Sequence, residues 1–186
     1  IGCKNIDKYQ PITFAACDNG MIYNEKKFLN FFNDKKIDII VWGARGYPGA
    51  YRQPNMYGWI STYRNSNKIK KISVKKQLKN PYSDPVVLGT FTFKNKKIFT
   101  ESFSKLKKNK RKINNEYYLD SCINEAINLK YNCYYFEVDY YLCWGTPNDL
   151  KTFEYWQACF NKWNFHPYKL QKDNRVNLKT IRNQFL

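Results

Sequence analysis

Two aspartates stand directly after apolar runs of the sequence. Asp18 follows "PITFAAC" (11–17), and Asp139 follows "YYFEV" (134–138). In an open α/β sheet, ligands bind beyond the carboxyl ends of the strands, so a residue just after a strand points towards the site. Two carboxylates at such a place can hold one Mg²⁺ ion, which usually takes one or two protein carboxylates together with substrate phosphates. We therefore predict that Asp18 and Asp139 bind a metal ion.

Both aspartates also have an ordinary structural interpretation. The sequence "DNG" (18–20) is typical of a turn, because Asn and Gly tolerate positive φ, and Asp18 would then only start that turn. Asp139 lies between "FEV" and "YYLC", where an acidic side chain can simply face water. The residue types and their spacing leave both alternatives open.

The segments around Asp18 predict an α/β sheet. The run 11–17 is typical of a short buried strand, 24–33 of a helix with one apolar face, and 37–43 of a second strand. Strand, helix and strand in this order indicate a right-handed crossover, with the two strands paired in parallel. Residues 44–55 are rich in Gly, Pro and Arg, which predicts a long surface loop.

The remainder of the chain predicts further strands and three helices. Apolar runs favour antiparallel strands at 56–63, 69–74 and 86–93, helices at 96–108 and 116–130, and another strand at 134–138. A further helix begins after Thr146, which can cap it, with Pro147 in the first position and Asp149 near the positive end of the dipole. The apolar stripe of this last helix predicts core packing; it consists of Leu150, Phe153, Trp156, Phe160 and Trp163. For His166, a turn or packing role is favoured.

The length and the charge of the chain limit the classes of protein to which it can belong. A chain of 186 residues fits one domain, and we take 1–186 as a single compact unit. The formal charge of +17 would suit a polyanion, either nucleic acid or a small phosphorylated substrate. Lysines are scattered, however, and dense only at "KKISVKK" (70–76) and "KLKKNKRK" (105–112), so a solvated surface is favoured.

Cysteine spacing and hydropathy indicate a reduced, cytoplasmic environment. The six cysteines show no CxxC pair and no His at zinc spacing, which favours free thiols over a structural metal or redox site. The chain opens on Ile1 and has neither an apolar leader nor a transmembrane run. We expect no membrane partner and a natural start upstream of Ile1.

The order of several motifs gives more information than any one of them. The stretches "ACDNG", "YGWI", "SVKK", "VVLGTFTF", "NNEYYLDSCINEA" and "VDYYLCWGTPNDLKTFEYW" occur in this order. Together they resemble the sugar-phosphate nucleotidyltransferases of bacterial capsule and lipopolysaccharide pathways, over about residues 10–165. "WGTPNDL" resembles a capsular subgroup that includes CTP:phosphoglutamine cytidylyltransferases.

The resemblance implies a fold and a reaction. The fold would be a glycosyltransferase-A-like, Rossmann-type mixed sheet flanked by helices. The reaction would transfer a nucleoside monophosphate from a nucleoside triphosphate to a phosphorylated acceptor, with Mg²⁺ as cofactor and pyrophosphate as product. Nucleic acid would not be a partner, and a homo-oligomer is left open. A basic, aromatic-rich nucleic-acid-binding module and a noncatalytic scaffold of the same fold are the alternatives.

The resemblance also assigns roles to individual residues. Asp18 matches the metal-binding aspartate of the family. Many relatives carry a second aspartate directly before Thr-Gly-Thr, where this chain has Cys143 and Trp144, so Asp139 is our choice for the second metal ligand. Gly58 matches the position whose backbone approaches the acceptor, flanked by Tyr57.

Further positions are assigned to the acceptor. Lys76 matches the lysine that binds the acceptor phosphate as a point charge, although a solvated strand lysine is the alternative. Glu116 and Asp120 match a motif near the acceptor pocket, but acids at a helix start are also ordinary dipole partners. For Arg45 and Arg52, a structural role is favoured over phosphate binding.

One part of the family pattern lies outside this sequence. The family begins with a Gly-rich loop that cradles the triphosphate with backbone amides, and only 17 residues precede Asp18 here. We therefore interpret 1–186 as the C-terminal two-thirds of a nucleotidyltransferase domain. The residues that read the nucleotide base would mostly lie in the missing part.

Overall fold

The computed structural model describes residues 2–173. This part of the chain divides into two compact units. The first unit consists of residues 2–17 and 21–141, and the second consists of residues 18–20 and 142–173. The first unit holds the main sheet, and the second holds a long helix near the end of the described chain.

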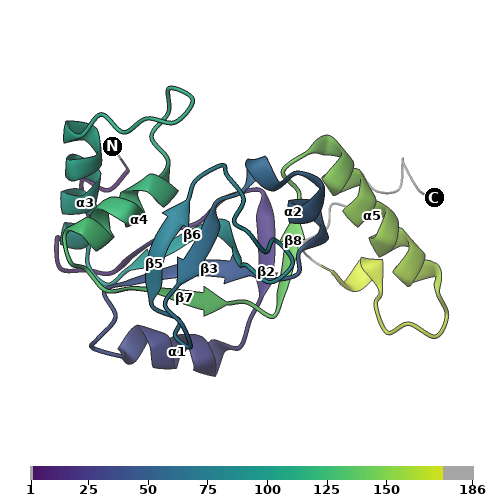
Figure 1. Cartoon of the computed structure of the whole chain (residues 1–186). Coiled ribbons are helices and arrows are strands. Elements are labelled where there is room, and N and C mark those ends of the chain that lie inside the picture. Colours follow the sequence, from purple (N-terminus) through teal and green to yellow (C-terminus); the bar gives the residue numbers. More distant parts are fainter. Residues whose placement is uncertain (1, 174–186) are drawn as a thin grey trace. The chain divides into compact units, whose positions relative to one another are not determined.

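The first unit is built on a mixed six-stranded sheet (Figure 1). Its order is β5-β4-β6-β3-β7, with β1 also paired to β6. Among the neighbouring strands of this sheet, only β3 and β7 form a parallel pair. The strands are β1 (Ile12–Phe14), β3 (Ile39–Ala44), β4 (Trp59–Thr62), β5 (Ile69–Ser73), β6 (Val86–Phe93) and β7 (Cys133–Glu137). Two further strands, β2 (Asn19–Ile22) and β8 (Tyr140–Cys143), form a separate two-stranded sheet. The mixed α/β fold predicted from the sequence is confirmed.

Strand β6 occupies the centre of the main sheet and separates two strands that the sequence predicted to be paired. Ile12 in β1 and Ile39 in β3 both face Phe93 of β6, each in an antiparallel pair. β1 and β3 therefore run in the same direction, but the predicted parallel pairing between them is wrong. Because β6 is the longest strand and its side chains are buried on both faces, it takes the central place.

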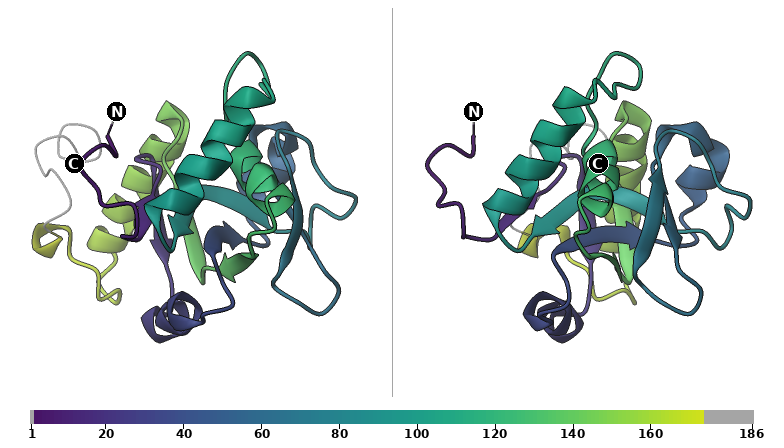
Figure 2. Two further views of the ribbon diagram at one scale, coloured as in Figure 1. Left: turned by 90° about the vertical axis from the view of Figure 1, so that its left-hand side faces the viewer. Right: turned by 60° about the vertical axis from the view of Figure 1, so that its left-hand side comes forward.

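Helices cover both faces of this sheet (Figures 1 and 2). α1 (Glu25–Asn33) lies on one face, and α3 (Lys96–Lys108) and α4 (Leu119–Asn128) pack against each other on the opposite face. The side chains of β3 alternate between two cores, because successive residues of a strand point to opposite faces. Ile39 packs towards α3 and α4, and Trp42 packs towards α1.

Capping side chains fix the starts of these helices. Asn24 accepts a hydrogen bond from the Lys27 backbone N–H at the start of α1, and Asn95 does the same for Ile98 at the start of α3. The segment 44–55 is not the long irregular loop that its composition predicts. It contains α2 (Pro48–Arg52) and the 3₁₀ turn η1 (Pro54–Met56), each beginning on a proline whose fixed φ suits the first helical position.

The second unit contains α5 (Pro147–Lys162) and the 3₁₀ turn η2 (Leu170–Lys172). The predicted helix start is confirmed, because Thr146 accepts a hydrogen bond from the Asp149 backbone N–H and Pro147 is the first helical residue. The predicted core packing of the apolar stripe is wrong for much of it. Leu150, Trp156 and Trp163 are 44%, 52% and 55% exposed, since this small unit offers little to cover them.

Stacked rings hold the end of α5 against the segment that follows it. His166 stacks on Phe160 and Trp163, and its Nδ1 accepts a hydrogen bond from the Tyr168 backbone N–H. This arrangement agrees with the turn and packing role predicted for His166.

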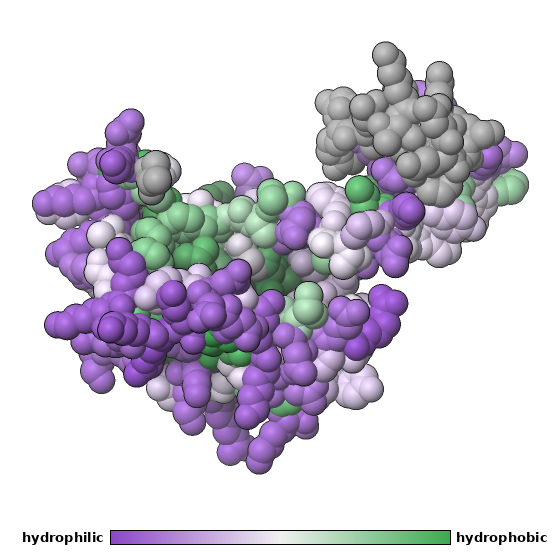
Figure 3. Space-filling view, turned by 90° about the horizontal axis from the view of Figure 1, so that it is seen from above, coloured by the Kyte–Doolittle hydropathy of each residue, from purple (hydrophilic) through white to green (hydrophobic). Residues whose placement is uncertain are grey.

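Hydrophilic residues cover much of the face seen in Figure 3. All six cysteines are free. Among residues 2–173, every helix is too short or too polar to cross a lipid bilayer.

Candidate functional site

Asp139 lies at the carboxyl end of β7, where the strand pattern predicted it. The Val138 N–H donates to the Gly43 carbonyl at 3.0 Å, so the pairing of β7 with β3 continues to the residue before Asp139. The Asp139 N–H donates to the Ile22 carbonyl at 2.9 Å, and its side chain is exposed. An exposed carboxylate in this position can accept a cation without a desolvation penalty.

Asp18 belongs to the second unit and faces the segment that precedes α5. Its carbonyl accepts a hydrogen bond from the Trp144 N–H at 2.8 Å. Its carboxylate lies against Gly145, because a Cβ built there would be 3.1 Å from Asp18 Oδ2 and 3.5 Å from Cys143 Sγ. This segment is where relatives of the resembled family carry their second metal aspartate. Asp139 belongs to the first unit, so the predicted pairing of the two aspartates stays a prediction.

The described chain shows no larger metal centre. Among residues 2–173, no three His, Cys, Asp or Glu side chains gather into a group that could hold a metal ion. A Mg²⁺ ion shared with a triphosphate requires only one or two protein carboxylates. The predicted pair is compatible with that requirement.

Gly58 and Asp120 touch in the first unit. A Cβ on Gly58 would lie 2.0 Å from Asp120 Oδ2 and 3.3 Å from a methyl group of Val87, so no side chain fits at Gly58. The Gly58 carbonyl accepts a hydrogen bond from the Val87 N–H at 2.8 Å, which ties this position to the edge of β6. The carboxylate of Asp120, in the first turn of α4, is thereby pressed against the backbone that precedes β4.

Lys75 brings an ammonium group to the same place. Its Nζ donates to the Met56 carbonyl at 2.5 Å and lies 5.5 Å from the centre of the Tyr118 ring. Lys75 follows the end of β5 by two residues and adopts a left-handed conformation with φ of 54°, which is uncommon for lysine. The charge of Lys75 also acts on Asp120. Gly58, Lys75 and Asp120 therefore form one cluster, which we call the Gly58 corner.

Burial has the largest effect on the pKa of Asp120 in the Gly58 corner. Loss of hydration raises the pKa of Asp120 to about 6, whereas the charge of Lys75 and a backbone hydrogen bond act in the opposite direction. Asp120 is therefore ionised at neutral pH but close enough to its pKa to be protonated in mild acid. A perturbed carboxyl group beside a lysine is a feature of binding and catalytic sites.

Lys76, which the sequence analysis predicts to bind the acceptor phosphate, differs in exposure from its neighbour Lys75. Its side chain is exposed, whereas that of Lys75 is partly buried. Its carbonyl accepts a hydrogen bond from the Ser73 hydroxyl at 2.6 Å. Lys75 is a further candidate that the sequence analysis does not select, since no local signal separates two adjacent lysines in "SVKK". The role of Lys76 stays a prediction.

The other predicted acceptor residues lie around the corner. Tyr57 directly precedes Gly58, and its ring contacts Tyr47 with centroids 6.0 Å apart. Glu116 is exposed, and its backbone pairs with Ile113 in a tight turn. A hydrogen bond between Glu116 and Tyr118 raises the pKa of Tyr118, so Glu116 connects to the ring beneath Lys75.

The side chain of Arg45 makes contacts within the fold. Its guanidinium forms an ion pair with Glu137, its Nε donates to the Ser83 carbonyl at 3.0 Å, and it lies 5.0 Å from the centre of the Tyr135 ring. These contacts join the carboxyl ends of β3 and β7. The structural role favoured for Arg45 therefore agrees with its contacts.

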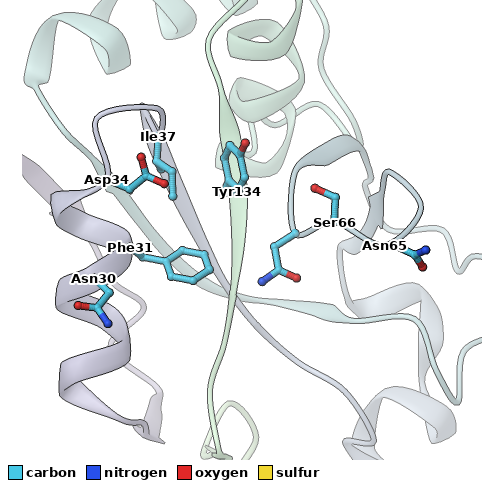
Figure 4. Close-up of a pocket in the computed structure, with 8 residues that line it drawn as sticks. Asn30, Phe31, Asp34, Ile37, Asn65, Ser66 and Tyr134 are labelled. Atoms are coloured by element: carbon cyan, nitrogen blue, oxygen red, sulfur yellow. The ribbon is translucent and has the colours of Figure 1, made fainter.

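A cavity of about 480 Å³ lies elsewhere in the first unit (Figure 4). Phe31 from α1 and Tyr134 from β7 line it together with Asn65 and Ser66 from the turn between β4 and β5. Tyr134 is near the amino end of β7, so this cavity is not at the edge where Asp139 lies. None of the described residues that line it is basic, and it does not suit a triphosphate.

Comparisons with known proteins identify the fold. No protein-family model matches the chain, and no curated protein matches its sequence. The nucleoside-diphosphate-sugar pyrophosphorylase from Vibrio cholerae superposes with a TM-score of 0.61 at 16% identity, covering 82% of this chain and 59% of that one. A putative glucose-1-phosphate thymidylyltransferase from Bacillus anthracis gives 0.58 at 20% identity, covering 81% and 55%. The inositol-1-phosphate CTP transferase from T. maritima gives 0.56 at 14% identity, covering 82% and 57%.

These solved structures are nucleotidyltransferases, and this chain spans less than three-fifths of the length of each. At such low identity the likeness concerns architecture, and the sheet with its flanking helices is what the proteins share. The described chain therefore has the mixed α/β fold of the nucleotidyltransferases.

Proposed function

We propose that this chain is part of a Mg²⁺-dependent nucleotidyltransferase. The enzyme would transfer a nucleoside monophosphate from a nucleoside triphosphate to a phosphorylated small molecule, with release of pyrophosphate. The Gly58 corner carries the proposal, because a glycine without space for Cβ lies beside a lysine and an acid. The resemblance places the acceptor at this position, and the fold likeness supports the same class of enzyme.

The proposed reaction requires positioning more than covalent chemistry. An oxygen of the acceptor phosphate attacks the α-phosphorus in line, a new P–O bond forms, and the bond to the β-phosphate breaks to release pyrophosphate. Most of the rate then comes from alignment and from neutralising crowded negative charge. Gly58 lets the acceptor approach the backbone, Tyr57 flanks it, and Lys76 and Glu116 are the further residues that the resemblance assigns to it.

The metal ion would be held by Asp18, with Asp139 as the second ligand. Both carboxylates are exposed, so neither is committed to an internal ion pair among the described contacts. Asp18 faces the backbone of Gly145, where the missing Cβ leaves space beside its oxygen. Carboxylate oxygens suit Mg²⁺, which when bound neutralises phosphate charge and orients the leaving group.

The finer assignment concerns the nucleotide and the pathway. We propose a cytidylyltransferase that activates a sugar phosphate or a phosphoglutamine-like acceptor for capsule or other surface-polysaccharide synthesis. The support for this assignment is the motif "WGTPNDL", which resembles the capsular subgroup.

The direct test is pyrophosphate release by the full-length protein. Each of the four ribonucleoside triphosphates is combined with glucose 1-phosphate, inositol 1-phosphate or phosphoglutamine in the presence of Mg²⁺. We expect turnover with at least one pair, CTP being the first choice, and its loss on addition of a chelator. An absence of turnover with every pair would contradict the proposal.

The role of Asp18 is tested by a matched pair of variants. Asp18→Asn should abolish metal-dependent turnover and leave the urea midpoint of unfolding unchanged, because the carboxylate is exposed. Asp7→Asn is the control, since Asp7 is also exposed and only accepts a local hydrogen bond from the Tyr9 N–H. Turnover by Asp18→Asn at the wild-type rate would remove Asp18 from the metal site.

A further inference from the structure

The cavity beside α1 has two walls that the fold holds in place. One wall is the end of α1, where Phe31 packs against Phe136 with ring centroids 5.6 Å apart. The other wall is the turn between β4 and β5, where the Asn67 carbonyl accepts a hydrogen bond from the Tyr135 N–H at 2.8 Å. Tyr135 and Phe136 are consecutive residues of β7, so both walls are attached to the same strand. The cavity of about 480 Å³ is thus preformed, as small-molecule sites usually are.

Three amide side chains line this cavity and take no part in holding the fold together. Asn30 belongs to α1, whereas Asn65 and Asn67 belong to the turn on the other side. Their side-chain amides form no hydrogen bond with any residue in the described part of the chain, 2–173. An asparagine amide offers two donor hydrogens and two acceptor lone pairs, and a hydroxyl group likewise both donates and accepts. Amides on two facing walls therefore suit a ligand that carries hydroxyl groups around its rim.

Two aromatic rings supply the apolar part of the lining. Phe31 extends from α1 towards the turn, and Tyr134 stands on β7 between the two walls (Figure 4). Such rings can pack on the C–H groups of a pyranose, while its hydroxyls reach the amides. Among the described residues of the lining, Asp34 alone is charged, and its Oδ1 accepts a hydrogen bond from the Lys36 N–H at 2.9 Å. The lining therefore disfavours anions, and a purely apolar ligand would leave the amides unpaired.

We propose that this cavity binds a neutral saccharide, through hydrogen bonds with Asn30 and Asn67 on opposite walls and through contact with the Phe31 ring. The proposal goes beyond the nucleotidyltransferase function, because the cavity lies at the amino end of β7 and Asp139 follows the carboxyl end. A nucleoside also uses amides and aromatic rings, but its base is flat and forms its hydrogen bonds along its edges. Since the amides here stand on two facing walls, the hydroxyls of a sugar fit them better.

Saturation-transfer difference NMR on the full-length protein tests the site. The probes are the methyl glycosides of glucose, galactose, mannose and N-acetylglucosamine, which carry no charge. We expect a signal from at least one probe with the wild-type protein. Asn30→Ala and Asn67→Ala should each raise the Kd of that probe roughly 3- to 10-fold, because each removes a neutral hydrogen bond. The urea midpoint of unfolding should not change, since both side chains are exposed.

Asn128→Ala is the matched control. Asn128 is an exposed asparagine at the end of α4, on the opposite face of the sheet from α1, and its replacement should leave the Kd unchanged. No signal from any glycoside with the wild-type protein, or binding that neither Asn30→Ala nor Asn67→Ala weakens, would overturn the proposal. Equal weakening by Asn128→Ala would also overturn it.

Adenosine is the probe for the nucleoside alternative. Adenosine binding that Asn30→Ala and Asn67→Ala weaken, without binding of any glycoside, would identify a nucleoside site and overturn the saccharide proposal. These measurements require no turnover. A failure of the saccharide site therefore leaves the pyrophosphate-release test of the proposed function unaffected.

Discussion

The carboxylate of Asp120 occupies the space that a side chain at position 58 would need. A Cβ on Gly58 would lie 2.0 Å from Asp120 Oδ2, far inside van der Waals contact. Gly58→Ala should therefore destabilise the first unit by about 1–3 kcal/mol through overpacking. Urea unfolding measures this change, and Gly2→Ala, which meets nothing within 4 Å, is the control.

A second substitution, Asp120→Ala, tests whether the collision with Asp120 causes the destabilisation by Gly58→Ala. In the Asp120→Ala background the colliding carboxylate is absent, so Gly58→Ala should cost much less than in the wild type. The difference between the two costs is the coupling energy of a double-mutant cycle. Equal costs in both backgrounds would mean that the collision at Asp120 is not the reason for glycine.

The pKa of Asp120 predicts how its ionisation affects stability. Because the folded-state pKa is about 6 and the ordinary value is 3.8, the folded protein binds more protons than the unfolded chain between these values. The contribution of Asp120 is therefore fully present below about pH 4 and is lost as the pH rises through about 6. Its full size is roughly 3 kcal/mol.

The measurement compares wild type with Asp120→Asn across this pH range. The variant has no ionisable group at position 120, so the difference in unfolding free energy should move in its favour by about 2 kcal/mol between pH 4 and pH 7. Other carboxyl groups contribute equally to both proteins and cancel. A difference that is constant with pH would contradict the raised pKa.

The buried acid Glu125 depends on a largely exposed partner. Its side chain is 1% exposed, Arg111 Nη1 lies 3.2 Å from Oε1, and the Asn109 amide donates to Oε2 at 3.0 Å. Arg111→Ala should cost about 2 kcal/mol, because a buried carboxylate would lose its counter-charge. Lys108→Ala, an exposed cation in the last turn of α3, is the control and should cost less than about 0.5 kcal/mol.

A rescue variant distinguishes charge from packing. In Arg111→Ala, the further change Glu125→Gln removes the unpaired charge and should recover part of the lost stability. Thermal unfolding at pH 7 follows both steps. If Glu125→Gln adds to the loss, the hydrogen bond from Asn109 matters more than the charge.

We expect only weak nucleic-acid binding in spite of the high positive charge of the chain. In the basic segment 105–112, Lys107 lies over the Phe103 ring of its own helix, and Arg111 is paired with Glu125. We expect affinity for single-stranded oligonucleotides no tighter than the nonspecific range of about 10⁻⁴ to 10⁻⁶ M at physiological salt. Fluorescence anisotropy across a salt series measures it. Nanomolar binding with a steep salt dependence would favour the nucleic-acid-binding module instead.

Local signals in the sequence were sufficient for α1, α3, α4 and α5 and for most strands, but not for the short helix α2. Thr146 with Pro147 marks the start of α5, and apolar runs mark β4, β5 and β6. The place of β1 could not be predicted in the same way, because its partner β6 is distant in sequence. The apolar stripe of α5 was misjudged since periodicity shows which residues share a face and does not show what covers that face.

Sequence motifs selected some of the residues of the candidate site. The motif "YGWI" located Gly58, whose need for glycine the structure explains through Asp120. Lys75 and its neighbour Lys76 differ in exposure, and Lys75 has a left-handed backbone. Lysine rarely adopts that conformation, so the sequence does not predict it. Residues assigned by resemblance still need the spatial arrangement that only coordinates provide.

The central position of β6 has a consequence for synthesis of the protein. Thr13 of β1 meets Thr92 of β6, and 79 residues separate them along the chain. During translation, β1 cannot form this pairing until β6 has left the ribosome. Until then its unpaired edge is open to other chains, so nascent chains truncated before β6 should depend on chaperones to stay free of aggregates.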